Sequence, residues 1–410
     1  MNARDALAAP ALAVFFVVVQ FYTSLAALSP TPPVGYAFVS RAGAGLLVAL
    51  LAAAAAWCGF RLWRDRAAPA PGSRELLSAW IASAALSALL GFDPLSSAQV
   101  VAIMLVTGLF HVALVRYFDA PGVARAVVGA YLATGFAASL AGLAMVALRT
   151  PAALWSLNHG RAAGLFVTAN QFAAYLLALT FVAAGAALAA TGLRRAGASA
   201  AAALAVVALA ATVSLAAWAG AAAGAVFYAA ALGAKRVAAA LVLCALLAAL
   251  AVALRPAAGH NPADEFDRLR TWRAGLRVAE LFPLWGVGPM AYWRVYPEVR
   301  PPNGDAPGTF GALHPHDAYL SLAGETGALG LAAFAYGWWA FVRALRAALR
   351  RATPPQRRFA LGTCAALVAM LVQGIFDTIG IVEMAFVWIP YTALALAAAG
   401  AGRPASGAAR

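Results

Sequence analysis

Acidic residues and lysines are scarce in this chain of 410 residues. Only 15 aspartates and glutamates stand against 29 basic residues, and Lys235 is the one lysine, so the net charge is +14. Charged residues make up 11% of the chain, less than half of the roughly 25% that soluble globular domains carry. Hydrophobic side chains make up 64%. This composition excludes a soluble globular protein and predicts several membrane crossings.

Cofactor and metal motifs are also missing. The three cysteines lie in or at the ends of apolar runs, which argues against a disulfide framework or a thiolate metal site. The chain has no P-loop, no G-x-G-x-x-G after a strand and no G-x-S-x-G elbow. No H-E-x-x-H or carboxylate-rich spacing accompanies the five histidines. We therefore expect no cofactor and no metal.

The excess of arginine indicates an anionic partner. Outside the apolar runs, the basic residues do not alternate with aromatic residues as in a nucleic-acid-binding surface. Membrane lipid and phosphate are therefore the expected partners, and nucleic acid is not. Arginine also holds phosphate bidentately, which lysine does not.

Twelve apolar runs predict an all-α polytopic membrane protein with about twelve transmembrane helices, since one crossing needs roughly 20 residues. Several runs are rich in alanine and glycine, which permits close packing of helices in lipid. The first run has no convincing cleavage site and is interpreted as a retained helix. The runs cover residues 7–28, 42–60, 76–91, 97–115, 126–147, 164–190, 199–216, 219–234, 237–254, 318–342, 359–376 and 385–400.

The basic residues predict how these helices are oriented. If the N-terminus is cytoplasmic, 19 of the 29 basic residues lie on the cytoplasmic side, as the positive-inside rule favours. Both termini are then cytoplasmic, and residues 255–317 form one large periplasmic loop. Seven of the ten remaining arginines fall in that loop. We divide the chain into N-terminal transmembrane helices (1–150), a region that contains the loop (151–345), and a C-terminal transmembrane hairpin with a cytoplasmic tail (346–410).

The loop contains an amphipathic stretch. Phe266, Leu269, Trp272, Leu276 and Ala279 recur at helical spacing and predict a helix lying along the outer membrane surface. Its arginines either face lipid headgroups or form an anion site, because forked guanidinium donors suit phosphate. These arginines are Arg268, Arg270, Arg273 and Arg277; Arg161, in the preceding outer loop, is a further candidate.

Two histidines lie where this loop meets the next helix. His316 stands before a predicted N-cap, Asp317, with Glu325 about two turns on. A histidine there is suited to act as a general base near neutral pH. His314 is the rival candidate, and a purely structural role is the alternative for both. Elsewhere, His111 is predicted to be a packed core residue, and Asp377 and Glu383 either cap helices or line a cavity near the last hairpin.

Taken together, these segments resemble the signature region of the O-antigen ligase and polymerase superfamily of bacterial surface-polysaccharide enzymes. The resemblance covers about residues 155–345. Its elements are an Arg with a Trp four residues on, a Pro-x-x-Gly-x-Gly turn, and a His followed by two spaced glycines. They correspond here to Arg268 and Trp272; Pro283, Gly286 and Gly288; His316, Asp317, Gly327 and Gly330; and, in the preceding helix start, Arg161, Gly164, Phe166 and Asn170.

Two positions depart from that pattern. Asp317 stands where the family more often has Asn, Ser or Gln, and a carboxylate there is expected to alter the basicity of His316. Many members also carry an arginine shortly after a serine on the helix corresponding to 212–222, and this chain has none there. Arg161 is the candidate to supply that charge.

The resemblance implies a metal-independent, inverting glycosyltransferase with an integral-membrane, GT-C-like fold in the bacterial inner membrane. The donor would be an undecaprenyl-pyrophosphate-linked glycan, and the acceptor a sugar hydroxyl of lipid A–core, at a periplasmic active site. His316 would be the general base, and Arg161 and Arg268 would stabilise the leaving pyrophosphate. Substrate binding is assigned to Arg270, Arg273, Arg277, Trp272, His314, Asp317, Tyr319, Glu325 and Asn170.

Two other functions are compatible with parts of this pattern. A polysaccharide polymerase of the same superfamily would differ only in its acceptor. A transporter with about twelve spans is the alternative from another class, but it should show ionisable residues near mid-membrane and two similar halves. The predicted spans here are nearly free of charge.

Overall fold

The computed structural model describes residues 7–21, 41–243, 262–299, 314–377 and 387–402, with side chains for all of these except 41–44, 47 and 262–268. The regular structure of these residues is entirely helical, which confirms the all-α prediction. The helices are α2 (Ala8–Gln20), α3 (Arg41–Arg64), α4 (Ser73–Leu90), α5 (Pro94–Tyr117), α6 (Val123–Leu148), α7 (Ala152–Leu157), α8 (Ala169–Ala189), α9 (Gly192–Ala211), α10 (Leu215–Ala231), α12 (Pro262–Leu281), α13 (Tyr292–Val299), α14 (Ala318–Leu349), α15 (Pro354–Gln373) and α17 (Ile389–Ala398).

Each of the twelve apolar runs carries a helix in its described part, including the run at 237–254, whose described start is helical. Among the described residues, five helices are long and apolar enough to cross a membrane: α5, α6, α8, α9 and α14. The shorter α2, α10 and α17 are also apolar. The fold is therefore that of a polytopic membrane protein, while a total of twelve crossings and the GT-C-like architecture remain predictions.

Small residues bring neighbouring helices into close contact, as their abundance predicted. A Cβ added to Gly362 on α15 would lie 2.7 Å from the Cα of Gly185 on α8. On α10, Cβ atoms at Gly220 and Gly224 would lie 2.5 and 2.8 Å from backbone oxygens of α15. The helices approach to backbone contact at these points, so side chains larger than glycine would force them apart.

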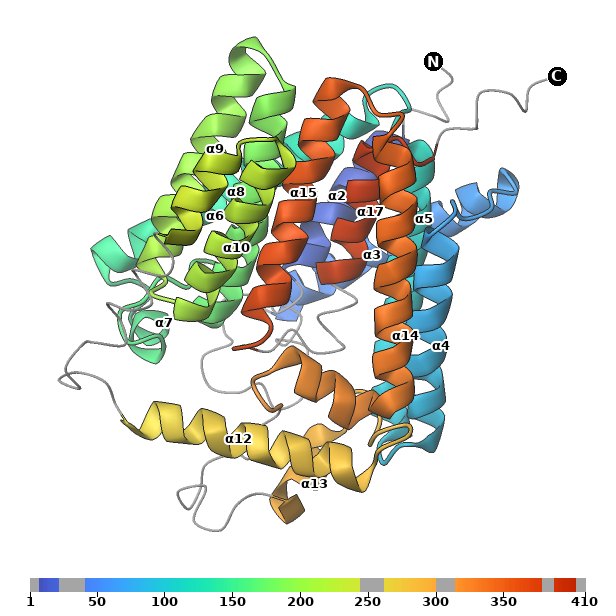
Figure 1. Ribbon diagram of the computed structural model, residues 1–410, viewed down its shortest axis with the longest axis vertical. Coiled ribbons are helices and arrows are strands. Elements are labelled where there is room, and N and C mark those ends of the chain that lie inside the picture. Colours follow the sequence, from blue (N-terminus) through green and yellow to red (C-terminus); the bar gives the residue numbers. More distant parts are fainter. Residues whose placement is uncertain (1–6, 22–40, 244–261, 300–313, 378–386, 403–410) are drawn as a thin grey trace.

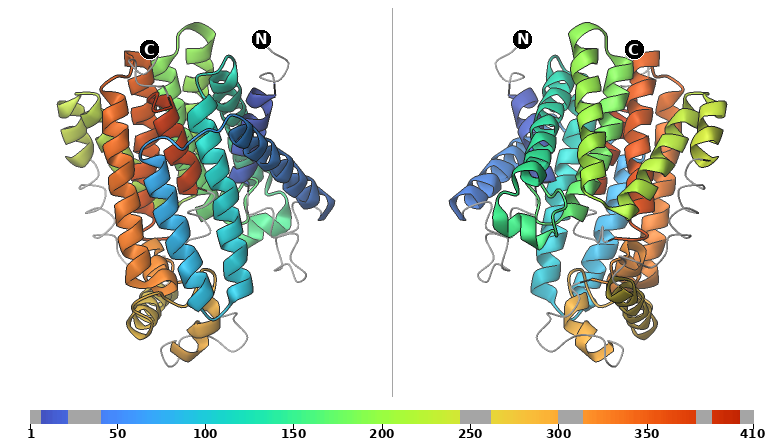
Figure 2. Two further views of the ribbon diagram at one scale, coloured as in Figure 1. Left: turned by 90° about the vertical axis from the view of Figure 1, so that its right-hand side faces the viewer. Right: turned by 90° about the vertical axis from the view of Figure 1, so that its left-hand side faces the viewer.

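The two ends of the bundle differ in structure. At one end, α12 lies across the other helices with α13 beside it, and α7 lies at that same end (Figures 1 and 2). The start of α2 and the end of α17 lie at the opposite end (Figure 1). This arrangement agrees with termini on one side and the large loop on the other.

Reporter fusions test which end faces the periplasm. We expect a fusion at residue 290 to report a periplasmic location and a fusion at residue 352 a cytoplasmic one, because the positive-inside rule places the arginine-rich 343–358 segment inside. Alkaline phosphatase and green fluorescent protein activities measure the two locations. A cytoplasmic signal at 290 or a periplasmic signal at 352 would overturn the orientation.

The prediction of one continuous helix over residues 318–342 is wrong in one respect. Helix α14 is broken at Gly327, whose backbone angles (φ 64°, ψ −165°) are not helical. Residues with a Cβ rarely adopt a positive φ, whereas glycine does so readily. The chain therefore changes direction within α14 (Figure 1), and the residues before the break form a separate short helix at the end of the bundle.

Candidate active site

The Gly-rich turn after α12 fits into the break of α14. The two backbones approach so closely that a Cβ at Gly286 would overlap the Glu325 carbonyl, and a Cβ at Gly327 would overlap that of Leu284. Four backbone hydrogen bonds join the segments: from Val287 to Gly324 (2.9 Å), from Gly288 to Glu325 (3.0 Å), from Ala328 to Pro283 (2.8 Å) and from Leu329 to Leu284 (3.1 Å). The turn thus satisfies backbone groups that the break leaves without helical partners.

The N-terminal third of the chain supports this turn from the other side. The Ser87 hydroxyl on α4 donates to the carbonyl oxygens of Trp285 and Glu325, each at 2.6 Å. The Ser97 hydroxyl on α5 donates to the Pro289 carbonyl at 2.7 Å. The Phe92 backbone amide donates to the Val287 carbonyl at 2.8 Å. The sequence analysis assigned no role to these positions.

Helix α13, which the sequence analysis treated as loop, is held by an ion pair. The Arg294 guanidinium lies 2.8 Å from the Asp93 carboxylate at the N-cap of α5. It also lies over the Trp293 ring, 4.5 Å from the centroid. The hydrogen bond from Arg294 lowers the pKa of Asp93. Helix α13 is therefore fixed to the start of α5.

Helix α12 holds the loop that carries the two histidines. The Trp272 indole N–H donates to the His316 carbonyl at 3.3 Å, and the Thr271 hydroxyl to the Pro315 carbonyl at 3.3 Å. His316 itself has a positive φ of 54°, which costs energy for a residue with a Cβ. These contacts offset that cost and fix the direction in which the His316 side chain leaves the backbone.

Asp317 caps α14, as predicted. Its Oδ1 accepts hydrogen bonds from the backbone N–H groups of Tyr319 and Leu320, both at 2.8 Å. Burial raises the pKa of the Asp317 carboxyl, while these two bonds act in the opposite direction. The carboxylate is thus engaged with the helix backbone.

Another carboxylate lies beside the His316 ring. Asp377, at the end of the turn after α15, places its Oδ1 3.8 Å from the His316 Nδ1. The His316 side chain is 43% exposed and that of Asp377 14%, so the histidine remains accessible while its partner is largely covered. Sixty-one positions separate the two residues, and sequence spacing does not predict the contact.

His314 packs edge-on against His316, with ring centroids 4.5 Å apart. Burial, followed by the proximity of His316, lowers the pKa of His314 to about 3. A histidine with this pKa stays neutral at every physiological pH and is a poor proton acceptor. His316 is the more accessible of the pair.

Arg161 and Asn170 meet at the same end of the bundle. The Arg161 Nη2 donates to the Asn170 Oδ1 at 2.7 Å, and its Nε to the Thr212 carbonyl at 2.7 Å. Thr212 follows α9 directly and precedes Val213, which has a positive φ. Arg161 therefore reaches the turn just before the helix on which the superfamily pattern predicts an arginine that this chain lacks.

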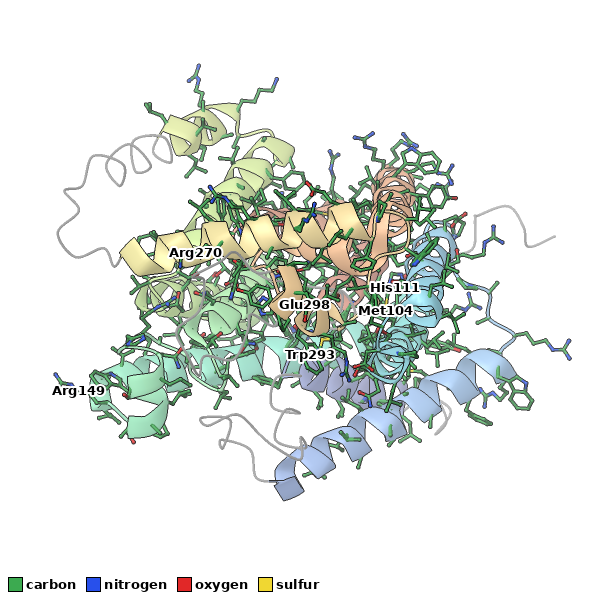
Figure 3. The ribbon with its side chains drawn as sticks, turned by 90° about the horizontal axis from the view of Figure 1, so that it is seen from below. Met104, His111, Arg149, Arg270, Trp293 and Glu298 are labelled. Carbon is green, nitrogen blue, oxygen red and sulfur yellow. The ribbon has the colours of Figure 1, made fainter. Side chains whose placement is uncertain are left out.

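The remaining predicted site residues divide into accessible and structural positions. Arg270 is half-buried on α12 (Figure 3), Arg273 is exposed, and Arg277 is exposed and paired with Glu280 at 3.1 Å. The Tyr319 hydroxyl donates to the Leu371 carbonyl at 2.8 Å, and Glu325 is buried beneath the turn. Arg268 lies on α12, but its side chain is outside the described residues, as are His260 and Glu383.

Helix α12 packs on the protein through a face other than the one predicted to lie along the membrane surface. Ala274 and Val278 are buried, and Gly275 lies against Pro315, so these small residues form the packed face. Leu269 and Leu276, expected on one face with Trp272, are each 52% exposed. The helix buries its small residues against α14 and leaves its leucines uncovered.

The segment that carries most of these contacts is similar to a known protein family. Residues 200–335 match the family model for the O-antigen ligase. This match confirms the resemblance to the O-antigen ligase superfamily. No curated protein matches the chain. The O-antigen ligase match includes Trp272, His316 and the glycines of the turn and the break, whereas Arg161 and Asp377 lie outside it.

Proposed function

We propose that this chain is an O-antigen ligase. It transfers a glycan from undecaprenyl pyrophosphate to a sugar hydroxyl of lipid A–core at the periplasmic face of the inner membrane. The observation that carries the proposal is the accessible His316 ring, whose Nδ1 lies near the Asp377 carboxylate while Trp272 of α12 holds the His316 backbone carbonyl. The family match supports a glycosyl-transferring enzyme of this superfamily.

The proton transfer follows from this geometry. With Nδ1–H directed to Asp377, the lone pair on Nε2 is available to the acceptor hydroxyl. Nε2 takes the hydroxyl proton as the oxygen forms its bond to the anomeric carbon. The Asp377 carboxylate stabilises the imidazolium that results, as an orienting carboxylate does in other histidine-base enzymes. The 3.8 Å separation is compatible with a contact that tightens when substrate binds.

The leaving group requires fixed positive charge. As the new bond forms on the face opposite the old one, the anomeric C–O bond breaks, and pyrophosphate leaves with the electron pair. The configuration is inverted. Arg161 and Arg268 would stabilise the charge that develops on the pyrophosphate, because guanidinium groups already in place need no reorganisation. Arg270, Arg273 and Arg277 would attract the donor to α12.

Asp377 provides a specific test of this arrangement. Asp377→Asn should lower kcat by about tenfold or more, because the amide cannot stabilise an imidazolium as a carboxylate does. KM for the donor should change little. Initial rates with purified enzyme and lipid-linked donor measure both constants.

Although the sequence placed Asp317 among the substrate-binding residues, its carboxylate accepts hydrogen bonds from the α14 backbone. Asparagine caps a helix about as well as aspartate, so Asp317→Asn is the matched control. Transfer should stay near normal. A loss in Asp317→Asn equal to that in Asp377→Asn would contradict the assignment of Asp377 as the partner of His316.

Lipopolysaccharide from a strain lacking the gene separates ligase from polymerase. A ligase is indicated if capped lipid A–core disappears while long lipid-linked chains are still made. Loss of the long chains themselves would indicate a polymerase and overturn the proposal. Reintroduction of the wild-type gene should restore the capped product, and reintroduction of the His316→Asn gene should not.

A further inference from the structure

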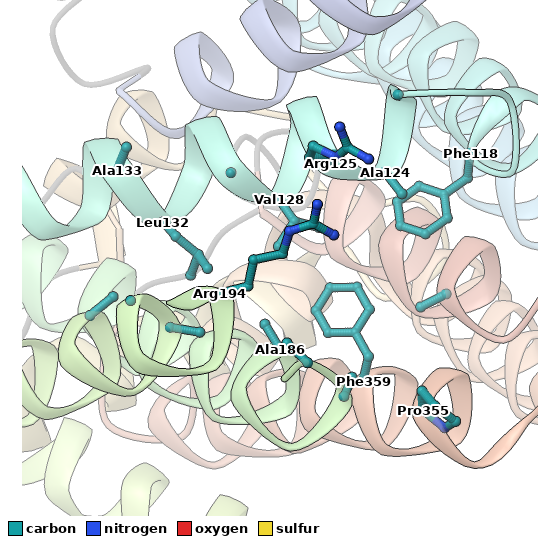
Figure 4. Close-up of a pocket in the computed structure, with 18 of the residues that line it drawn as sticks. Phe118, Ala124, Arg125, Val128, Leu132, Ala133, Ala186, Arg194, Pro355 and Phe359 are labelled. Atoms are coloured by element: carbon teal, nitrogen blue, oxygen red, sulfur yellow. The ribbon is translucent and has the colours of Figure 1, made fainter. Parts of the chain in front are cut away.

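A large pocket opens at the end of the bundle opposite α12. Its volume is about 1090 Å³, and its lining comes from the segment 118–122 between α5 and α6, the N-terminal halves of α6 and α9, the start of α15, the end of α8 and the last residue of α17. None of the residues assigned to the active site lines it. It is therefore a separate feature of the fold (Figure 4).

The wall of this pocket is apolar. Val128, Leu132 and Phe136 on α6 face Phe359 on α15, with alanines of α8 and α9 between them. Two lining glycines, Gly129 on α6 and Gly197 on α9, would meet no atom within 4 Å if they carried a Cβ. These glycines are therefore not contact points between helices, and the space beside them is available to a ligand with hydrocarbon chains.

Two arginines stand at the pocket, one from each wall. Arg125 lies in the first turn of α6 and Arg194 in the first turn of α9, and their guanidinium groups extend toward the middle of the pocket (Figure 4). Both are exposed, and within the described part of the chain neither forms a hydrogen bond or an ion pair. Asp119 is the one acidic residue in the lining. The lining thus carries a net charge of +1.

We propose that this pocket binds an anionic phospholipid. The phosphate lies between Arg125 and Arg194, and the acyl chains lie along the apolar wall between α6, α8 and α9. A phosphate oxygen pair suits the guanidinium fork, and a singly negative headgroup such as phosphatidylglycerol matches the net charge of the lining. Basic pockets between transmembrane helices are a recurring kind of lipid site. Because α6 and α9 are both helices that could span a membrane, their first turns would lie at headgroup depth.

Native mass spectrometry of the full-length purified protein, with phosphatidylglycerol and phosphatidylethanolamine added in equal amounts, tests the proposal. The wild-type protein should retain phosphatidylglycerol in preference to phosphatidylethanolamine. Double replacement of Arg125 and Arg194 by alanine should weaken retention of phosphatidylglycerol by a factor of roughly five for each arginine, or about 25-fold in all. Arg195→Ala is the matched control, because Arg195 is exposed beside Arg194 but does not line the pocket, and it should retain the lipid.

A second variant addresses the apolar wall. Gly129→Leu places its Cβ where no atom lies within 4 Å and improves helix propensity, so the protein should remain folded while the longer side chain displaces both lipids. Gly45→Leu on α3, where a Cβ also meets nothing, is the control and should retain lipid. The proposal fails if the double arginine variant and Gly129→Leu keep phosphatidylglycerol, if the two lipids are retained equally, or if the pocket is covered by a second copy of the chain, seen as a lipid-free dimer.

Discussion

Replacing His316 with asparagine should reduce glycan transfer by about 10³-fold, within the range that general bases contribute. Asparagine is the most informative substitution here, because it tolerates the positive φ of 54° at this position better than other residues with a Cβ. It cannot, however, accept the hydroxyl proton. The backbone contacts from α12 should therefore persist. Transfer from a purified lipid-linked donor to lipid A–core measures the rate, and donor binding should remain close to that of the wild-type protein.

His314→Asn is the control for this substitution. Since its burial lowers the pKa of His314 to about 3, this residue is neutral at both pH 5 and pH 8 and does not titrate where the activity is measured. Because such an imidazole is a poor proton acceptor, transfer should fall far less in His314→Asn than in His316→Asn. Full activity in His316→Asn, or a loss of transfer confined to His314→Asn, would show that His316 is not the general base.

The helices could be predicted from the sequence because lipid imposes a strong constraint. Each crossing requires about 20 apolar residues with satisfied backbone groups. Each of the twelve apolar runs therefore carries a helix in its described part. The break at Gly327 could not be predicted in this way. It depends on the turn around Gly286, whose hydrogen bonds replace those lost from α14, and a hydropathy pattern contains no information on that partner.

Site contacts between residues close in sequence could be predicted, whereas contacts between distant segments could not. The cap at Asp317 follows from its position before an apolar helix, and the structure confirms it. The contact between His316 and Asp377 joins two segments that the packing of α14 and α15 against α17 brings together. Ser87 and Ser97 support the turn from helices with no motif of their own, since a serine in an apolar helix does not reveal its acceptor.

Replacing Arg161 with alanine should lower transfer by about 10² or more, if its guanidinium stabilises the leaving pyrophosphate. Its contacts with Asn170 and the Thr212 carbonyl orient the guanidinium against the α9–α10 turn, which is the geometry that fixed positive charge requires. Arg149→Ala is the matched control: Arg149 is exposed and lies over the Trp155 ring, 5.6 Å from the centroid, well away from α12 (Figure 3). That variant should transfer glycan normally.

Arg161 also supports the turn after α9, so a structural role must be separated from an electrostatic one. Arg161→Gln can still donate a hydrogen bond to the Thr212 carbonyl but carries no charge, whereas Arg161→Lys keeps the charge and loses the fork. If Arg161 stabilises the leaving group, lysine should restore part of the activity and glutamine none, while all three variants keep similar thermal stability. If glutamine restores transfer and lysine does not, Arg161 acts only by holding the turn. The arginines of α12 would then stabilise the negative charge on the leaving pyrophosphate.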